Sequence, residues 1–547
     1  MSKRSLSPVV LPPSKRLHIS KNNTFTSRPL RSFDTLLSDE IILLVFSFLS
    51  PSDLCAAQSV SHNWSRLALD NQLWKSLFVG EYGRQRLRGG KGFVKRADGR
   101  EVKPLPARVP PDPAKEAPRD WKWMFKISSN WRTGRCQLTR FTPFPFPPNH
   151  PPPISERMHV LLAGPMTIYA SSKPSQAPTI TITCASSSDA FTVYPTVNSL
   201  IPVQITSLAA DQCPPLPDII RFAVCLSTGE LAVYELRGHH AQMPTRTHHY
   251  AGSRSRRTHP ILQAAYHHPL LFTLSKTFSL SVYDATREAL QLVHHLSSFS
   301  SWPPASLVLT APSANTFKLL ITYASPVYPQ HWSLGVTEVL MSCPARASTS
   351  AQSAFRLLST RSVRAFDVPP GWANEARMRV VREQWARKTL AVAATNSDGK
   401  WVVLAPTETS CLACAPSFPA AATGGAHPIR RHWTPSSLPL QLYRVSFPPL
   451  DAGASAAPRL TFVRYLYGQT SPVASLALAD GRCVSLGVDG SVWAWDLETA
   501  RGVQVYSASP SMQEEPMQNG VLGLITFDER RIISSSPGGV LVRDFDT

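Results

Sequence analysis

The sequence FDTLLSDEIILLVFSFLSPSDLCAAQSVSHNWSRLALDNQLWKSLF, residues 33–78, decides the fold of the N-terminal region. Its first helix, predicted over residues 38–49, is apolar at nearly every position from Ile41 to Leu49. A helix that is apolar on all sides has to be buried on all sides. A unit of about 45 residues is close to the size at which a domain can no longer build an adequate core alone. We therefore expect one face of this helix to pack inside the unit and the other to pack against a partner protein.

Start signals divide the rest of the stretch into short helices. Ser38 is placed to cap the first helix, and Asp39 and Glu40 suit its first turn. Ser50, followed by Pro51, begins a second helix with a sequence that resembles a capping box. A third segment carries Val60, Trp64, Leu67 and Ala68 on one helical face, and Trp74, Leu77 and Phe78 predict a further turn or two.

The spacing of these residues resembles the F-box. The family pattern appears as LSDEIILLVFSFLSPSDL over 37–54, VSHNW over 60–64, and the pair Leu73-Trp74. One departure is Ser38, where the family usually has proline after the first leucine. Serine is a competent helix cap, so we expect the fold to be kept. The resemblance implies a small all-α domain of three helices.

The F-box resemblance also implies docking onto the Skp adaptor of cullin–RING (SCF-type) ubiquitin ligases. The positions that correspond to the family's adaptor-binding motif are Leu37, Ile41, Leu44, Val45, Leu49, Leu54, Val60 and Trp64. The sequence does not separate those that face the adaptor from those that face inward. The alternative is a three-helix lid packed on the rest of the same chain.

Composition limits the other functions open to the chain. The net charge of +20 suits an acidic or phosphorylated partner, or a basic solubilising surface. The sequence has 50 Pro in 547 residues, against a typical share of about 5%, which disfavours long helices. Of nine cysteines, only Cys411 and Cys414 form a CxxC, and no second pair completes a zinc set, so we expect reduced thiols and no metal or other cofactor.

Targeting signals point to the inside of the cell. The N-terminus is polar and basic rather than an apolar leader, and no apolar run approaches the length of a membrane span. Lys3-Arg4 and Lys15-Arg16 are candidate nuclear import signals. We therefore expect the cytoplasm, the nucleus or both, and no membrane partner.

The sequence predicts four regions. Residues 1–32 are a disordered basic tail, 33–80 the F-box, 81–135 a basic, proline-rich linker with a connecting helix, and 136–547 a β-rich domain. The connecting helix carries Trp121 and Phe125 on one face. The turn Asn130-Trp131-Arg132 resembles the entry to the propeller in F-box proteins that have one.

Residues 136–547 read as short strands separated by Gly, Pro, Asp and Ser, which predicts an all-β repeat domain. An aromatic residue followed by an acidic one recurs at Tyr234-Glu235, Tyr283-Asp284 and Trp495-Asp496, and Arg543-Asp544 is a looser copy. Repeat spacings close to the ~40–45 residues of a WD-repeat blade resemble a WD-repeat β-propeller. The length accommodates seven or eight degenerate blades.

The end of the chain indicates how the ring closes. The last repeat supplies three strands and lacks a fourth. An unpaired edge is a liability that closure removes. We expect residues 137–141 to pair with residues 540–546 and to close the propeller.

Catalytic motifs are missing from the sequence: we find no P-loop, GxSxG, HExxH or GxGxxG in a suitable setting, and expect no enzyme activity. Histidine pairs at 239–240, 248–249 and 267–268 read as loop residues rather than zinc ligands. Arginine recognises phosphate and carboxylate through paired hydrogen bonds. The candidate substrate-binding residues are therefore Arg254, Arg256, Arg257, Arg430 and Arg431, with basic surface loops as the alternative.

The leading functional prediction is a substrate receptor. The F-box would dock on the Skp adaptor while the propeller holds a target protein for ubiquitination. One alternative is an F-box protein that sequesters or inhibits a partner outside the ligase. A third, a basic propeller that binds nucleic acid, would need basic strands interleaved with aromatic residues, which the sequence reading does not find.

Overall fold

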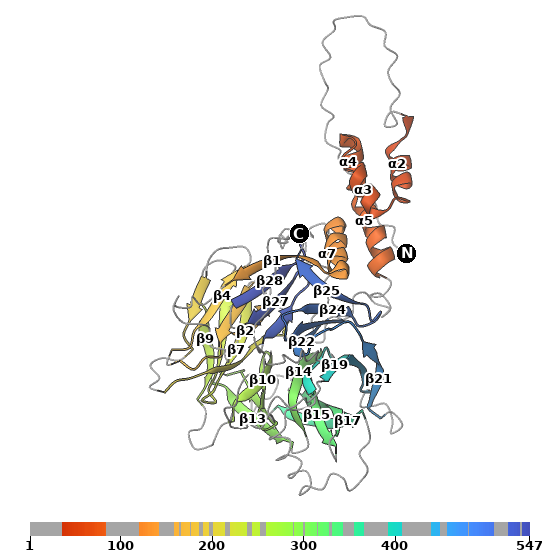
Figure 1. The fold of residues 1–547 in the computed structure, drawn as a ribbon. Coiled ribbons are helices and arrows are strands. Elements are labelled where there is room, and N and C mark those ends of the chain that lie inside the picture. Colours follow the sequence, from red (N-terminus) through yellow and green to blue (C-terminus); the bar gives the residue numbers. More distant parts are fainter. Residues whose placement is uncertain are drawn as a thin grey trace, which may run out of the picture. The chain divides into compact units, whose positions relative to one another are not determined.

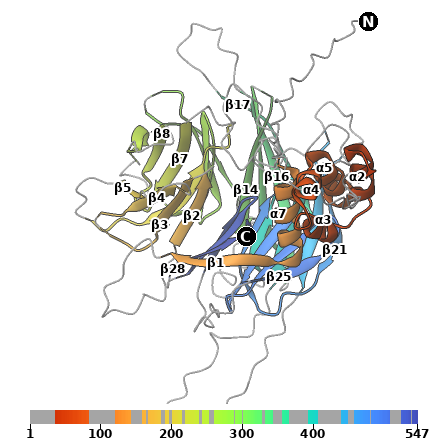
Figure 2. The same cartoon turned by 90° about the horizontal axis from the view of Figure 1, so that it is seen from above.

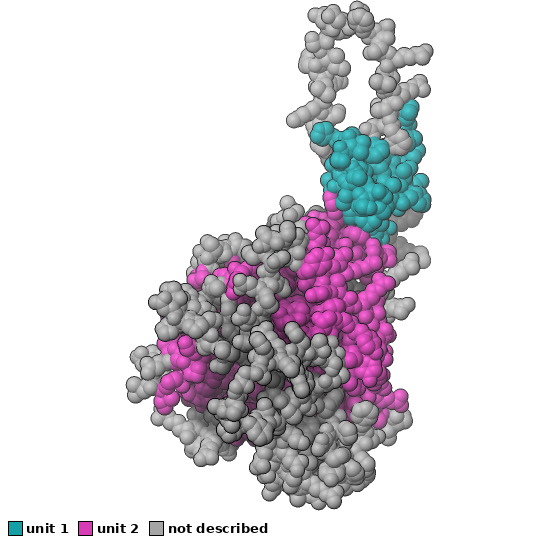
Figure 3. Space-filling view, viewed as in Figure 1, with its two compact units in different colours: residues 1–77 teal, residues 78–547 magenta. Residues whose placement is uncertain are grey.

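The computed structural model describes residues 36–83, 120–141 and most of 158–546, where the longest gaps are 343–354, 366–391, 407–438 and 508–522. The chain divides after Leu77 into two compact units, which Figure 3 colours separately. The predicted tail over 1–32 and most of the predicted linker lie outside the described residues. No helix in the described ranges is long and apolar enough to span a membrane.

The first unit is helical. Its helices are α2 (Asp39–Phe46), α3 (Pro51–Ala57), α4 (His62–Ala68) and α5 (Asn71–Phe78), the last of which ends just beyond the unit boundary. The sequence predicted three helices and a further turn or two, and that turn is a full helix. The predicted first helix was also too long, because the chain leaves the α-helix after Phe46 and continues in a turn.

Side-chain caps explain where three of these helices begin. The Ser50 hydroxyl accepts a hydrogen bond from the Asp53 N–H at 3.2 Å, and the Ser61 hydroxyl accepts one from the Trp64 N–H at 3.1 Å. The Asp70 carboxylate accepts from the Gln72 N–H at 2.8 Å. Ser38 occupies the N-cap position of α2, but its hydroxyl does not accept a capping hydrogen bond from a backbone N–H of the helix, so this part of the prediction was wrong.

Within the second unit, a connecting helix, α7 (Trp121–Thr133), precedes the first strand of the propeller. Asp120 caps its start by accepting from the Trp123 N–H at 3.0 Å, and Gly134 ends it in a left-handed conformation at φ 73°. A side chain at Gly134 would meet the Gln504 carbonyl oxygen at 2.3 Å, so this close approach also requires glycine. Before it, Val79–Gly83 forms the π-helix η1.

The second unit is a propeller of four-stranded antiparallel sheets (Figures 1 and 2). The first two blades are β2 (Met158–Ala163), β3 (Met166–Ser171), β4 (Ile180–Cys184), β5 (Ala190–Val193), then β6 (Ile205–Ala210), β7 (Ile219–Leu226), β8 (Leu231–Arg237), β9 (Thr245–Tyr250). The next two are β10 (Ile261–His267), β11 (Leu270–Ser275), β12 (Ser279–Asp284), β13 (Gln291–Ser297), then β14 (Trp302–Ser313), β15 (Thr316–Val327), β16 (His331–Ser342), β17 (Arg356–Arg364).

The remaining blades complete the ring. They are β18 (Val392–Ser397), β19 (Trp401–Pro406), β20 (Leu440–Ser446), β21 (Arg459–Leu466), then β22 (Val473–Ala479), β23 (Arg482–Gly487), β24 (Val492–Asp496), β25 (Gly502–Ser507), and finally β26 (Leu524–Phe527), β27 (Arg531–Ser536), β28 (Gly539–Asp544) with β1 (Arg135–Phe141). The first strands of successive blades, β2, β6, β10, β14, β18, β22 and β26, neighbour one another and return to β2. Over the described residues the ring therefore has seven blades.

The last blade takes its outer strand from the start of the domain. β1 pairs antiparallel with β28, from Gln137 opposite Asp544 to Phe141 opposite Val540. The first residues of β1 also pair in parallel with β25, where Arg135 lies opposite Tyr506. β1 consequently joins the sixth and seventh blades into one eight-stranded sheet.

Helix α7 packs against the last blade, close to the end of β28. The Trp131 ring stacks on Phe545 at 4.1 Å between centroids, and its indole N–H donates to the Glu529 carbonyl oxygen at 2.9 Å. The Trp123 indole N–H donates to the Asp546 carboxylate at 2.6 Å, and the Asn130 amide donates to the Phe545 carbonyl oxygen at 2.8 Å. Residues 130–132, predicted to form a turn, lie in the last turn of α7 instead, and Asn130 and Trp131 contact the C-terminal end of the ring.

The core of the propeller lies between blades rather than within them. Each apolar cluster combines strands of two neighbouring sheets, such as Phe222 and Tyr234 of the second blade with Ile168 and Ile182 of the first. The recurring aromatic–acidic pairs at 234, 283 and 495 lie on β8, β12 and β24, and Arg543-Asp544 lies on β28. All four strands are the third of their blade, so the sequence repeat marks a structural repeat.

Candidate functional site

The candidate site is built on the two faces of α2 in the first unit. Ile42 and Phe46, four residues apart, point inward and are buried with Leu54 and Leu67. The Phe46 ring also meets the Trp64 ring edge-on at 5.4 Å. These contacts form the small core of the unit.

The opposite face of α2 is apolar and exposed. Ile41 is 47% exposed, Leu44 61%, Val45 43% and Phe48, in the turn that follows, 83%. Their spacing of i, i+3, i+4 and i+7 places the four side chains on one side of the helix. We call Ile41, Leu44, Val45 and Phe48 the outer face of α2. A cluster of large apolar side chains left in water is typical of a protein interaction site.

The structure sorts the eight residues that the sequence assigned to adaptor binding. Ile41, Leu44, Val45 and Val60 are exposed, whereas Leu37, Leu49 and Trp64 are partly buried. Leu54 has no exposed surface, so the structure corrects its assignment from the interface to the core. Val60 precedes α4 rather than lying on its buried face, so that expectation was wrong.

Sequence reasoning missed Phe48, the most exposed large apolar residue of the first unit's described part, and also Leu36 and Leu69. The signal for Phe48 was present, because it lies seven residues after Ile41 and completes the apolar side of the helix.

An acidic side chain, Glu40, lies beside the outer face of α2. The pKa of Glu40 lies below its usual value because its own backbone N–H and the Ser38 hydroxyl donate to its carboxylate.

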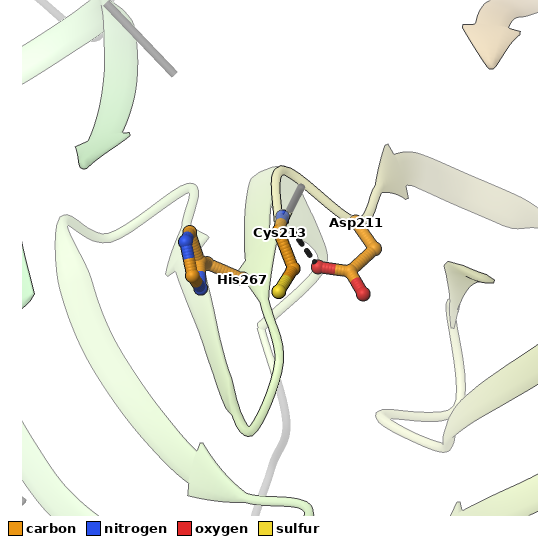
Figure 4. A group of neighbouring side chains, drawn as sticks. All are labelled: Asp211, Cys213 and His267. Atoms are coloured by element: carbon orange, nitrogen blue, oxygen red, sulfur yellow. Dashed lines mark hydrogen bonds between the residues drawn. The ribbon is translucent and has the colours of Figure 1, made fainter. Parts of the chain in front are cut away.

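The propeller contains one group of side chains, among the described residues, that could hold a metal ion. Ligand atoms of Asp211, Cys213 and His267 lie within 4.8 Å of one another (Figure 4). One carboxylate oxygen of Asp211 already accepts from the Cys213 N–H at 2.9 Å and the His268 N–H at 3.0 Å. Its other oxygen lies 3.8 Å from the Arg221 guanidinium. Asp211 therefore joins the second blade to the third, beside a positive charge that disfavours a bound cation.

Two histidines close to this group have lowered pKa values. Burial, followed by the Arg221 charge, lowers the pKa of His248 and of His268.

The structure also places the predicted histidine pairs. Those at 248–249 and 267–268 lie on or beside strands, not on loops as the sequence predicted. His239, His240, Cys411 and Cys414 lie outside the described residues, as do all five candidate substrate-binding arginines, Arg254, Arg256, Arg257, Arg430 and Arg431.

Two family models match the chain. One, described as F-box-like, matches residues 39–80. The other, described as the F-box protein pof12 beta-propeller, matches residues 183–391. The first match coincides with the four helices, and the second begins in the first blade.

Several curated proteins are similar over a shorter length. "Probable E3 ubiquitin ligase complex SCF subunit sconB" of Arthroderma benhamiae is 31% identical over 128 residues, which cover 20% of this chain and 18% of that protein. "F-box/LRR-repeat protein 5" of Mus musculus is 42% identical over 50 residues, which cover 9% of this chain and 7% of that protein. The chain thus matches less than a fifth of the length of these relatives.

Among solved structures, the Cps50 (Swd1) beta-propeller domain of Myceliophteria thermophila aligns with 71% of this chain and 96% of its own, at 10% identity and a TM-score of 0.37. The family matches and the geometry agree on a helical unit followed by a closed ring of blades. The chain therefore combines a helical unit that matches the F-box-like family model with a closed β-propeller.

Proposed function

We propose that this protein is the substrate-recognition subunit of an SCF-type cullin–RING ubiquitin ligase. The outer face of α2 docks on the Skp adaptor, and the propeller holds the target protein. The observation that carries the proposal is the set of four apolar side chains on the outer face, exposed on a unit whose own core is complete without them. The similarity to a protein named as a subunit of an SCF ubiquitin ligase supports the choice of ligase.

The role proposed for the chain is positional. A receptor accelerates ubiquitin transfer by holding the target near the conjugating enzyme, which raises the effective concentration of the reacting groups. The basic net charge of +20 favours an acidic or phosphorylated target. Burial of Leu44 and Phe48 against the adaptor would contribute up to about 1.5–3 kcal/mol for each side chain.

The experiment is co-purification of the full chain with the recombinant Skp adaptor. Leu44→Asp plus Phe48→Asp should abolish recovery of the adaptor, because two charges would be buried at the interface without partners. Leu358→Asp is the matched control, since Leu358 is also an exposed leucine, on β17 of the propeller. Leu54 is avoided because a charge at this buried position would unfold the unit.

Equal recovery of the adaptor by wild type and the double variant, with unchanged circular dichroism, would overturn the proposed docking. Action outside the ligase is a separate outcome. In that case the adaptor would bind through the outer face, but the abundance of proteins captured by the propeller would not rise when the proteasome is inhibited.

A further inference from the structure

Strand β21 has an unusual composition for an edge strand. It is the outer strand of the fifth blade, and β20 is the only partner it has among the strands that the structure describes. Figures 1 and 2 both show β21 at the rim of the propeller. An edge strand presents unpaired backbone N–H and C=O groups that can pair with another chain.

A β-bulge aligns the aromatic residues of this strand. Leu442 lies opposite Arg464 and Tyr443 lies opposite Phe462, so Val463 is an extra residue in β21. In a regular strand, residues three apart point to opposite faces, but one extra residue reverses the alternation. Phe462 and Tyr465 therefore share a face.

The aromatic rings on this face form a continuous row. Tyr443 contacts Phe462 at 5.5 Å between centroids, Phe462 contacts Tyr465 at 4.9 Å, and Tyr465 contacts Tyr467 at 6.1 Å. Tyr443 is buried, whereas the other three rings are 43–71% exposed. We call Phe462, Tyr465 and Tyr467 the aromatic row.

The opposite face of the sheet, along β20 and β21, is basic. Residues that lie opposite each other in an antiparallel pair point to the same side of the sheet. Arg464 is opposite Leu442, and Arg459 is opposite Ser446, so both share a side with Arg444, whose guanidinium lies 5.9 Å from the Trp401 ring. All three arginines are exposed, and β20 and β21 contain no acidic residue.

These observations specify a ligand. A strand added to the edge of a sheet projects alternate side chains to its two faces. Beside β21, one set would contact the aromatic row and the other would contact the arginines. We propose that β21 binds an extended segment of a partner protein in which apolar or aromatic residues alternate with acidic ones. The proposal does not depend on the ligase function, because it concerns the outer edge of one blade.

The test uses a fluorescein-labelled (Glu-Tyr)5 peptide and the full chain, with binding followed by fluorescence anisotropy. A peptide of the same composition in two blocks, five Glu followed by five Tyr, is the control for pattern. The alternating peptide should bind at least about tenfold more tightly, since only its pattern matches both faces. Hydrogen–deuterium exchange should show new protection over residues 459–467.

Two pairs of variants test the faces separately. Tyr465→Ser plus Tyr467→Ser should weaken binding about tenfold, while Tyr194→Ser plus Tyr506→Ser, which alters two other exposed tyrosines, should not. Arg464→Glu should weaken binding strongly at low salt, while Arg356→Glu on β17 should not.

Equal binding of the two peptides, equal loss in the control variants or protection elsewhere on the ring would overturn the proposal. Competition by single-stranded oligo(dT) as strong as that by the alternating peptide would also overturn it. That result would make the row of aromatic and arginine residues a nucleic-acid surface, because stacking platforms with basic neighbours bind single strands without sequence preference.

Discussion

The F-box unit and the propeller differ in how far they bury their apolar side chains. Helix α2 directs Ile42 and Phe46 into a small core and leaves the four residues of its outer face in water. The propeller places apolar residues of both faces of its sheets between blades, and pairs even its last strand, β28, with β1. The comparison teaches that the propeller pairs its own final strand, whereas α2 of the F-box unit leaves one apolar face exposed.

The most severe test of the self-contained ring is to remove its final strand. Deletion of residues 538–547 removes β28, which pairs with both β27 and β1, and Phe545, which stacks on Trp131. We expect the cooperative thermal transition of the propeller to be lost, a change comparable to the whole stability of a domain, about 5–15 kcal/mol. Calorimetry measures it. Deletion of residues 1–32 is the control, and an unchanged transition in the C-terminal deletion would refute closure as the source of stability.

Trp131→Ala tests the same closure with one side chain. The variant loses the stacking on Phe545, the hydrogen bond to Glu529 and the contact with Arg482, whose guanidinium lies 4.6 Å from the ring. Urea denaturation should show a loss of about 3–5 kcal/mol. Trp131→Phe keeps the stacking and loses the indole hydrogen bond, so its cost should be about 1–2 kcal/mol. Equal costs for the two variants would contradict this assignment.

The two faces of the F-box unit can be compared with one substitution at two leucines. Leu54→Ala empties a buried position and should destabilise the unit by about 2–5 kcal/mol. Leu44→Ala changes an exposed position and should alter stability by less than about 0.5 kcal/mol. Hydrogen–deuterium exchange over residues 39–77 measures both. A similar loss of protection in the two variants would mean that Leu44 belongs to the core.

The helix caps provide a smaller test within the F-box unit. Ser50→Ala removes the hydroxyl that accepts from Asp53, at a cost of about 1 kcal/mol. Ser38→Ala should cost less than about 0.5 kcal/mol, because the Ser38 hydroxyl does not accept a capping hydrogen bond from a backbone N–H of α2. Chemical denaturation of the two variants in parallel gives the comparison. A larger effect at Ser38 would show that α2 depends on its serine cap.

The smallest expected effect is a loss of stability of the propeller at low pH. Burial raises the pKa of Glu235, but its ion pairs with Arg221 at 2.8 Å and Arg237 at 2.7 Å outweigh burial and hold the pKa below its usual value. A carboxylate with a lowered pKa stabilises the fold above its usual pKa, and this stabilisation is lost as the pH falls through the folded-state value. Exchange protection of β7 and β8 should fall in acid, and should do so less in Glu235→Gln. In the F-box unit the pKa of Glu40 is also lowered, but its carboxylate is exposed, so the loss of stability in acid should be smaller there.

The sequence supported prediction of both folds because each has a strong local pattern. Capping residues and helical spacing locate α2 to α4, and the pairs at 234–235, 283–284 and 495–496 mark third strands. The division between the interface and the core was beyond sequence reasoning, because Leu54 and Leu44 are chemically alike and differ only in what surrounds them. The aromatic row was hidden as well, because Phe462 and Tyr465 share a face only through the bulge at Val463.

The pairing of β1 with β28 has a consequence for the making of the protein. Thr139 of β1 and its partner Val542 are 403 residues apart in the chain. At a translation rate of about 5–20 residues per second, β1 waits on the order of 20–80 s for the strand that completes its blade. For that interval the nascent polypeptide carries an open edge and an uncovered Trp131. Chaperone demand during biosynthesis should therefore concentrate at residues 121–141.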